Sequence, residues 1–277
     1  MSQYVLVTGA GSGIGKCIAK KYAAEGYSVV AVDWNAEALQ SVKDGIERSS
    51  RVTVLPVTAN LMDDDAPEKI LQQCRDAGAE VEILINCAGM GAAGEFAESD
   101  WNRQKGIVEL NVVALMHMIR VFLPEMLERG HGQICNIASN AGFMPLAPQP
   151  TYGASKAFVI SFTQALYETY HKKGIDFTVI CPGPTKTAFF KDAGFDVHFL
   201  SRLWGNAELT FKGHEERRHF KCNESFENIT ESDLKSYAAV IIPAGYVADR
   251  LRFTDDIHKL PPACEFLKKC FADKGII

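Results

Sequence analysis

The sequence contains no long run of lysine or arginine, and its formal net charge of -5 offers no basic surface to nucleic acid or to an anionic membrane. It also contains no stretch that approaches the ~20 uninterrupted apolar residues of a membrane span. An apparent strand starts at Tyr4, which leaves no room for a signal peptide before it. We therefore expect a cytoplasmic protein with no nucleic-acid partner and no membrane span.

The eight cysteines include no Cys-x-x-Cys pair, and most of them lie inside apolar segments. We interpret them as reduced packing residues and not as disulfides or zinc ligands. They are Cys17, Cys74, Cys87, Cys135, Cys181, Cys222, Cys264 and Cys270. His214 and His219 have no carboxylate or cysteine at metal-ligand spacing, so we interpret them as surface residues. No metal site is predicted.

Short segments rich in Val, Ile and Leu alternate with amphipathic segments along the first two thirds of the chain. The predicted strands are Tyr4–Val7, Ser28–Val32, Arg51–Val57, Glu82–Ile85, Gln133–Ala138 and Phe177–Cys181. The predicted helices are Lys16–Gly26, a helix from Asn35, Ala66–Ala77, Trp101–Glu128 (one helix or two) and Thr151–Lys172. This alternation predicts an α/β fold: a single Rossmann-like, doubly wound parallel sheet with helices on both faces.

The alternation stops after Ala188. Phe189–Trp204 is rich in aromatic residues and Lys212–Lys221 is dense in charge, which is typical of a mobile lid over a binding site. Pro243–Leu251 and Pro262–Phe271 read as helices. With 277 residues, 47% of them hydrophobic, we expect one domain over residues 1–277. We expect its regular α/β core to span residues 1–187, and its lid and irregular C-terminal segment to span 188–277.

A glycine-rich turn follows the first predicted strand, in the order Thr8-Gly9-Ala10-Gly11-Ser12-Gly13-Ile14-Gly15. A strand, such a turn and a helix form half of a dinucleotide-binding unit, because glycines let the backbone approach a pyrophosphate at the helix N-terminus. Asp33 closes the second strand, where a carboxylate binds the adenosine ribose hydroxyls and repels a 2′-phosphate. Asp33 could instead cap the next helix, a role that Asn35 can fill. The turn and Asp33 together favour NAD over NADP.

Tyr152 and Lys156 are four residues apart in a predicted helix, so they lie on one face, one turn apart. A tyrosine with a pKa of about 10 is a poor acid or base at neutral pH. Lowering that pKa to roughly 7 takes about 4 kcal/mol, which a positive charge at ~4 Å supplies at an effective dielectric constant near 20. The pair therefore suits a tuned acid or base, although the same spacing also occurs on solvated helix faces.

Six motifs occur in the order and spacing of the short-chain dehydrogenase/reductase family, which the chain resembles over residues 8–187. They are Thr8-Gly9-x-x-x-Gly13-Ile14-Gly15, Asn86-x-Ala88-Gly89, Asn111, Ser139, Tyr152-x-x-x-Lys156 and Pro182-Gly183-x-x-x-Thr187. Each motif alone is weak, and six in register are specific. Three departures stand out: Asn60 where many members have Asp, Cys87 for the second Asn of Asn-Asn-Ala-Gly, and no Val-Asp-Gly-Gly ending.

The resemblance implies four catalytic residues. Tyr152 would protonate a carbonyl oxygen during reduction, or deprotonate an alcohol during oxidation, as hydride passes to or from nicotinamide. Lys156 would lower the pKa of Tyr152 and hold the nicotinamide ribose. Ser139 would orient the reacting oxygen. Asn111 would bind a water that links Lys156 to solvent.

The resemblance also implies which residues hold the cofactor. They are Gly9, Ser12, Gly13, Ile14 and Gly15 at the pyrophosphate and adenosine, Asp33 at the ribose, Asn60 and Leu61 at the adenine, Asn86, Ala88 and Gly89 along the cofactor, and Pro182, Gly183 and Thr187 at the nicotinamide, with Tyr152 and Lys156 beside it. The family's NADP-preferring members often place a basic residue at the positions of Ser12 and Trp34, and this chain has none there.

We therefore expect an oxidoreductase that transfers hydride between NAD(H) and a secondary alcohol or ketone. The alternative is a regulatory protein that binds NAD without turnover. Aromatic and aliphatic residues near the predicted site indicate a bulky apolar substrate, although they could equally form lid or interface core. They are Phe143, Met144, Phe189, Phe190, Phe195, Phe199, Leu203 and Trp204. The resemblance further implies a homodimer or homotetramer assembled through Trp101–Glu128 and Thr151–Lys172.

Overall fold

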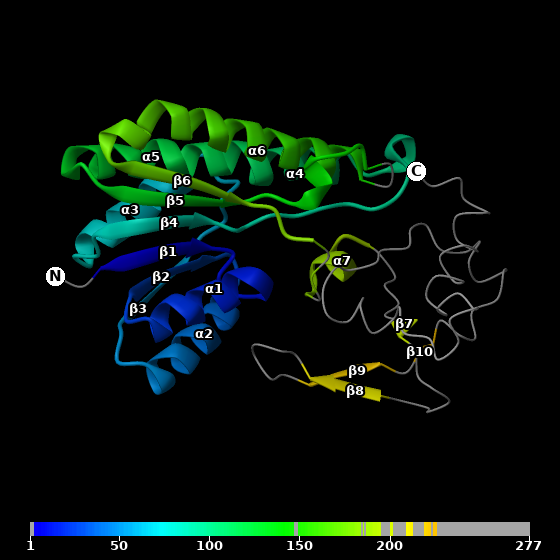
Figure 1. Ribbon diagram of the computed structural model, residues 1–277, viewed down its shortest axis with the longest axis horizontal. Helices are drawn as coiled ribbons and strands as arrows, with labels where there is room; N and C mark the ends of the chain where they lie inside the picture. Colours follow the sequence, from blue (N-terminus) through cyan, green and yellow to red (C-terminus); the bar gives the residue numbers. More distant parts are fainter. Residues whose placement is uncertain are drawn as a thin grey trace, which may run out of the picture. The chain divides into compact units, whose positions relative to one another are not determined.

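Six parallel strands form one sheet in the computed structural model, in the order β3-β2-β1-β4-β5-β6 (Figure 1). The strands are β1 (Tyr4–Thr8), β2 (Ser28–Asp33), β3 (Val54–Thr58), β4 (Val81–Asn86), β5 (Gly132–Ile137) and β6 (Ile175–Ile180). The order runs outward from β1 in both directions, so the crossover helices lie on both faces of the sheet. The predicted doubly wound α/β fold is confirmed.

The structure describes residues 3–146, 149–183, 185 and 187–194, and the backbone of four short strands beyond them. By contacts the chain divides into Met1–Phe195 and Asp196–Ile277. In the second unit, β7 (Leu200–Ser201) pairs in parallel with β10 (Glu224–Ser225), and β8 (Leu209–Lys212) pairs antiparallel with β9 (His219–Cys222). Of the predicted lid, the side chains from residue 195 onward lie outside the described residues, as do His214 and the two predicted C-terminal helices. The single-domain assignment stays a prediction.

The helices of the first unit divide between the two faces of the sheet. The elements are α1 (Gly13–Ala24), α2 (Ala36–Ser49), α3 (Ala66–Asp76), η1 (Phe96–Glu98), α4 (Trp101–Val108), the π-helical η2 (Glu109–Ala114), α5 (Leu115–Arg129), η3 (Asn140–Gly142), α6 (Pro150–Tyr170), η4 (His171–Lys173) and α7 (Phe189–Asp192). In Figure 1, α1 and α2 cover one face, and α4, α5 and α6 cover the other.

Alternating side chains of each strand enter two separate cores. Val5 and Val7 pack among α1 and α2, with Leu39 and Ile46. Leu6 points the other way, into the core of α3, α5 and α6. Because successive strand residues face opposite sides, strands buried on both faces need continuous apolar runs. This requirement is the physical reason why the six strands could be predicted from the sequence.

The continuous helical run Trp101–Arg129 is the one segment of the described chain that is long and apolar enough to cross a membrane, by length and composition only. Half of its most apolar 18-residue stretch is buried inside the protein. Met118, Ile119 and Phe122 lie in the core beneath the sheet. The apolar composition of this run is thus what a core helix of a doubly wound fold requires.

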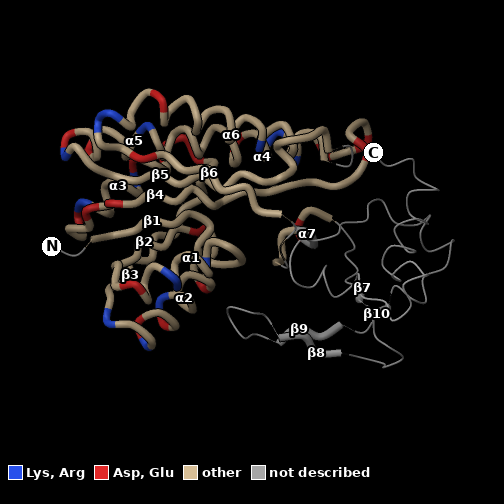
Figure 2. Tube along the Cα trace, in the orientation of Figure 1, with Lys and Arg blue, Asp and Glu red and all other residues tan. Residues whose placement is uncertain are grey.

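Acidic and basic residues are interspersed along the helices and loops of the described region, while the strands are largely free of charge (Figure 2). The five described cysteines, Cys17, Cys74, Cys87, Cys135 and Cys181, are free thiols. Burial raises the pKa of Cys74 and of Cys87 to about 12, so neither thiol ionises at neutral pH. These thiols act as small apolar side chains.

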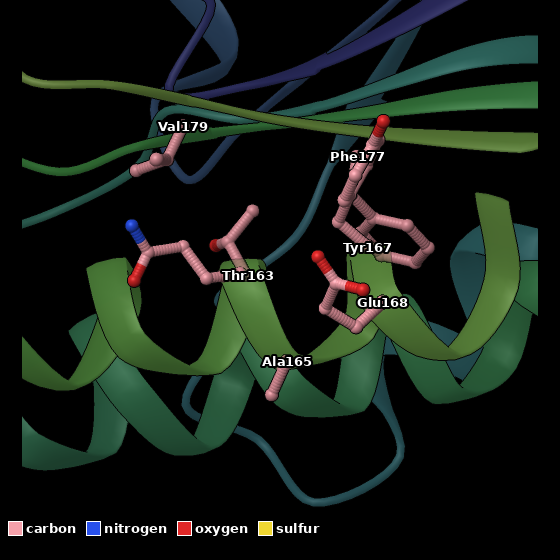
Figure 3. Close-up of a pocket in the computed structure, with 7 residues that line it drawn as sticks. Thr163, Ala165, Tyr167, Glu168, Phe177 and Val179 are labelled. Carbon is pink, nitrogen blue, oxygen red and sulfur yellow. The ribbon is translucent and has the colours of Figure 1, made fainter.

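The strand β6 forms one edge of the sheet and borders an open hollow against α6 (Figure 3). Its lining residues are Thr163, Gln164, Ala165, Tyr167, Glu168, Phe177 and Val179. Neither a predicted catalytic residue nor a predicted cofactor contact lines it. The hollow is therefore separate from the candidate active site.

Two glycines with left-handed backbone precede β5 and β6, and they provide a matched test of the packing between these strands. A side-chain carbon added to Gly130 (φ +75°) would meet no other described atom within 4 Å, whereas one on Gly174 (φ +81°) would collide with the Gly130 carbonyl oxygen. We expect Gly130→Ala to lower the free energy of unfolding by about 1–2 kcal/mol. Gly174→Ala should lower it by at least a further ~1 kcal/mol, because overpacking adds to the backbone cost. Urea unfolding of both variants measures the difference, and equal losses would show that the collision relaxes freely.

Candidate active site

The carboxyl ends of the parallel strands meet at one edge of the sheet, and the predicted site residues follow those ends. Gly9 follows β1, Asp33 ends β2, Asn86 ends β4, Ser139 follows β5 and Pro182 follows β6. Open α/β sheets bind ligands at this edge. Residues far apart in the sequence are therefore brought to one region by the strand order alone.

The glycine-rich turn is built by close backbone contacts. A side-chain carbon on Gly15 would collide with the Gly9 carbonyl oxygen, and one on Gly9 (φ +67°) would lie 3.0 Å from Ala88 Cα. The Thr8 hydroxyl accepts hydrogen bonds from the backbone N–H groups of Cys87 (2.9 Å) and Ala88 (3.1 Å). Thr8 thus joins the turn after β1 to the turn after β4.

The N-terminus of α1 suits a diphosphate. Ser12 is the N-cap, its side chain makes no capping hydrogen bond among the described residues, and the first turn contains no acidic residue. The first N–H groups of a helix without such a cap remain available to an anion. A side-chain carbon on Gly13 (φ +50°) would lie 3.4 Å from Thr187 Cγ2, so Thr187 lies beside the turn although it is far along the chain. These groups fit the pyrophosphate of a dinucleotide.

Asp33 supports the same turn through its carboxylate. Its Oδ2 accepts a hydrogen bond from Gly11 N (2.9 Å), and its Oδ1 accepts one from Asn35 N (3.0 Å). The N-cap of α2 is Asn35, whose Oδ1 accepts from Ala38 N at 2.9 Å. Asp33 therefore lies half-buried at the end of β2, and the helix cap belongs to Asn35.

Lys156 is buried, and its ammonium donates a hydrogen bond to the Ile137 carbonyl at the end of β5 (2.8 Å). Burial lowers the pKa of Lys156 to about 8. A side-chain carbon on Gly89 would lie 3.5 Å from Lys156 Nζ and 3.2 Å from Asn111 Oδ1, so the missing side chain of Gly89 leaves room for both groups. The Nζ atom lies 5.7 Å from the centroid of the Tyr152 ring.

Burial raises the pKa of Tyr152, and a hydrogen bond with Ser139 acts in the opposite direction. The sequence predicted a pKa lowered by Lys156, and this prediction is wrong for the protein without a ligand. Desolvation of the phenol outweighs the hydrogen bond, and the Lys156 ammonium is directed at the Ile137 carbonyl. Tyr152 therefore keeps its proton at neutral pH.

Asn111 lies in the π-helical turn η2 and connects three elements. Its Nδ2 donates to the Met90 carbonyl and to the Ser155 hydroxyl, both at 3.0 Å, and its Oδ1 accepts from Met90 N at 2.9 Å. The Ser155 hydroxyl in turn donates to the Tyr152 carbonyl at 2.7 Å. A π-helical turn inside an α-helix is frequent at functional sites. Asn111 positions the loop after β4 against α6, and its predicted water-binding role stays a prediction.

The other predicted contacts divide into two groups. Asn86 donates to Asn136 Oδ1 (2.9 Å) deep in the fold, and its own Oδ1 is buried without a described partner. Asn60 is exposed and its side chain holds a local turn, through Asp63 Oδ1 (2.9 Å) and Met62 N (3.2 Å). Leu61 packs partly against the core. Asn60 thus has a structural role that its amide fulfils without an adenine.

The turn after β6 lies against the turn that carries Ser139. Asn140 N donates to the Pro182 carbonyl at 3.1 Å, and a side-chain carbon on Gly183 would lie 3.8 Å from Asn140 Nδ2. Ser139 Oγ accepts from Ala141 N at 3.2 Å. Pro182, Gly183 and Ser139 are therefore neighbours; their predicted roles, at the nicotinamide for Pro182 and Gly183 and at the reacting oxygen for Ser139, stay predictions.

Residues outside the six motifs form a wall beside Tyr152, which consists of Phe189 and of the Gly91 loop and α7 that Arg103 connects. The Phe189 ring lies 5.2 Å from the Tyr152 ring, between centroids. Arg103 Nη2 donates to the carbonyls of Gly91 (2.7 Å) and Asp192 (3.0 Å), which ties the loop after β4 to α7. No sequence signal marks Arg103, since an arginine near the start of an amphipathic helix is ordinary.

A family model described as "short chain dehydrogenase" matches residues 3–196. The chain belongs to the short-chain dehydrogenase/reductase family. It is an oxidoreductase of this family that uses a nicotinamide cofactor.

Three relatives illustrate the range within this family. An NADP-dependent 3-hydroxy acid dehydrogenase of Escherichia coli K12 is 34% identical over 195 residues, which are 69% of this chain and 76% of the relative. A Burkholderia phymatum short-chain dehydrogenase/reductase solved with NAD is 30% identical, with a TM-score of 0.66 over 69% of each chain. The bulky-bulky ketone specific alcohol dehydrogenase of Comamonas testosteroni is 30% identical, with a TM-score of 0.63 over 66% of this chain and 73% of that one.

The opposing influences on Tyr152 predict the effect of Ser139→Ala. Removing the hydrogen bond that lowers the pKa of Tyr152 leaves burial unopposed, so the pKa should rise further. The measurement is an ultraviolet titration of tyrosinate, in which subtraction of the Tyr152→Phe titration isolates this phenol. Ser139→Thr, which keeps a hydroxyl, is the control and should leave the midpoint close to wild type. A midpoint that falls in Ser139→Ala would contradict the assignment.

Proposed function

We propose that the protein is an NAD(H)-dependent dehydrogenase that interconverts a secondary alcohol and a ketone. The observation that carries this proposal is the grouping of Ser139, Tyr152 and Lys156 beside the glycine-rich turn at one edge of the sheet. An acid, an orienting hydroxyl and a buried ammonium next to a dinucleotide site suit proton transfer coupled to hydride transfer.

The bound cofactor would supply or accept a hydride at the carbon of the substrate. In reduction, the Tyr152 hydroxyl donates its proton to the oxygen of the carbonyl as the carbon gains the hydride. In oxidation, the Tyr152 phenolate takes the proton of the alcohol. Ser139 Oγ would donate a hydrogen bond to the reacting oxygen, and Lys156 would hold the ribose and supply positive charge near the phenol. The raised pKa of Tyr152 supports its role as an acid in reduction at neutral pH.

Asp33 supports NAD as the cofactor. Its carboxylate closes β2 where an adenosine ribose would lie, and the adjacent positions Ser12 and Trp34 carry no positive charge. A carboxylate binds ribose hydroxyls and repels a 2′-phosphate. The relatives include both an NADP-dependent enzyme and one solved with NAD, so the preference depends on these local residues.

A bulky apolar substrate fits the surroundings of Tyr152. Phe189 packs against the Tyr152 ring, and the side chains of Phe143 and Met144 are 66% and 64% exposed close after Ser139. The Comamonas relative, named for bulky-bulky ketones, uses a related fold. The side chain of Phe190 and all of Phe195, Phe199, Leu203 and Trp204 lie outside the described side chains.

We also propose a homodimer or homotetramer assembled through the helical run Trp101–Arg129 and α6. Apolar side chains are exposed on both: Trp101, Val108, Val113, Met116, Phe158 and Tyr167. Exposed apolar patches on helices suit association. A cytoplasmic location also stays part of this proposal.

Replacing Tyr152 tests the reaction. Tyr152→Phe removes the proton donor and keeps the ring against Phe189, so kcat for ketone reduction should fall by about 10²–10⁴-fold. Cofactor binding, measured by NADH fluorescence, should change little. Turnover at the wild-type rate would overturn the mechanism. Tight NADH binding with no turnover by wild type on any alcohol or ketone would instead favour the regulatory alternative.

Asp33→Asn tests the cofactor preference. The amide keeps an acceptor for the turn and removes the charge that repels a 2′-phosphate. The ratio of kcat/KM with NADPH to that with NADH should rise at least about tenfold, because a charge pair at a protein surface is worth about 1–4 kcal/mol at 4 Å. Asp44→Asn, on the exposed surface of α2, is the control and should leave the ratio unchanged. A wild-type preference for NADPH would refute the assignment.

A further inference from the structure

Gln149 is a buried polar residue, 3% exposed. In the described part of the chain its side-chain amide makes no hydrogen bond. Its backbone is fully used: Gln149 N donates to the Leu146 carbonyl, and its own carbonyl accepts from Gly153 N. Buried amides are normally paired, because an unpaired one loses its hydrogen bonds to water without replacement.

Gln149 lies at the start of the helix that carries Tyr152. It is the N-cap of α6, three residues before Tyr152, so it directly precedes the first turn, which contains Tyr152. A side-chain carbon placed on Gly91 would lie 3.5 Å from Gln149 Oε1 and 3.0 Å from Phe189 Cζ. The Phe189 ring also packs against the Tyr152 ring, so the Gln149 amide oxygen and Tyr152 both lie near this aromatic side chain.

The surroundings of this amide are held in place. Arg103 binds the Gly91 carbonyl through Nε (3.0 Å) and Nη2 (2.7 Å), and Nη2 also binds the Asp192 carbonyl. Ala93 N donates to the Ala193 carbonyl at 2.8 Å. These bonds fasten the Gly91 loop to α7, so the groups around the Gln149 amide oxygen are held in place. A fixed, mostly apolar wall with one unpaired amide is typical of a specificity site.

We propose that the Gln149 amide binds a second oxygen of the substrate, close to the carbonyl that Tyr152 protonates. This inference rests on the proposed function and names its substrate class: ketones with a hydroxyl or carbonyl oxygen near the reacting carbon and an apolar remainder against Phe189. An uncharged amide offers both a donor and an acceptor, so it suits a neutral hydroxyl or carbonyl. A site built to bind such an oxygen rejects the analogue that lacks it, because the amide is then left unpaired.

Pairs of ketones that differ only in a second oxygen test whether the Gln149 amide binds that oxygen. Benzoin carries a hydroxyl and benzil a second carbonyl next to the reacting carbonyl, and deoxybenzoin carries neither. A small pair, 3-hydroxy-2-butanone and 2-butanone, repeats the comparison without bulk. For wild type, kcat/KM should be about 10–100-fold higher for the oxygenated member of a pair, which corresponds to one hydrogen bond to a buried group.

Gln149→Met keeps the size of the side chain and removes the amide. We expect it to abolish the preference by lowering kcat/KM for the oxygenated ketones and to leave deoxybenzoin or 2-butanone unchanged or improved. Gln164→Met, at an exposed position of the same helix, is the control and should retain the preference. Binding is measured in parallel, from the change in fluorescence of bound NADH on titration with each ketone.

The outcomes separate this inference from the proposed function. If the enzyme turns over the ketones but wild type shows no preference for the oxygenated ones, this inference alone is overturned. The same holds if Gln149→Met keeps the preference. A preference in binding that depends on Gln149, without turnover, supports this inference and overturns the proposed reaction. If the protein neither binds nor turns over any of the ketones, both this inference and the proposed function are overturned.

Discussion

The hydrogen bond from Lys156 to the Ile137 carbonyl is the contact on which the site depends. It anchors α6 to the end of β5, and Ser139 and Tyr152 lie at those two elements. A buried ammonium is costly unless it is paired, and here the penalty appears as a pKa lowered to about 8. Gly89, which has no side chain, leaves room for the Lys156 ammonium, and the hydrogen bond from Asn111 to Ser155 holds the neighbouring loop against α6.

The same burial explains the chemistry of Tyr152. A phenol removed from water resists ionisation, so it holds its proton, as the proposed reduction requires. Ser139 opposes this effect with a hydrogen bond and would also meet the reacting oxygen. Acid strength in this site therefore follows from the balance of burial and one hydroxyl, and a bound cofactor with its charge would add to that balance.

The wall beside Tyr152 combines residues from three separate segments. Phe189 supplies the apolar surface, Gln149 supplies an amide with no hydrogen-bond partner among the described residues, and Arg103 fastens the Gly91 loop to α7 through backbone carbonyls. Because Arg103 binds backbone groups, its role does not depend on which side chains surround it. The wall gives the site a mixed character, apolar with one polar position, and in the proposed reaction this character would select among ketones.

The sequence by itself determined the fold and the outline of the site. Continuous apolar strands buried on both faces, the turn from Thr8 to Gly15, and the four-residue spacing of Tyr152 and Lys156 are local patterns, and local patterns are readable. Only the tertiary structure decided the direction of the Tyr152 pKa shift and the roles of Asn60, Arg103 and Gln149. Each of these depends on burial or on the partner a polar group finds, and burial and partners are set by segments far along the chain that no short pattern records.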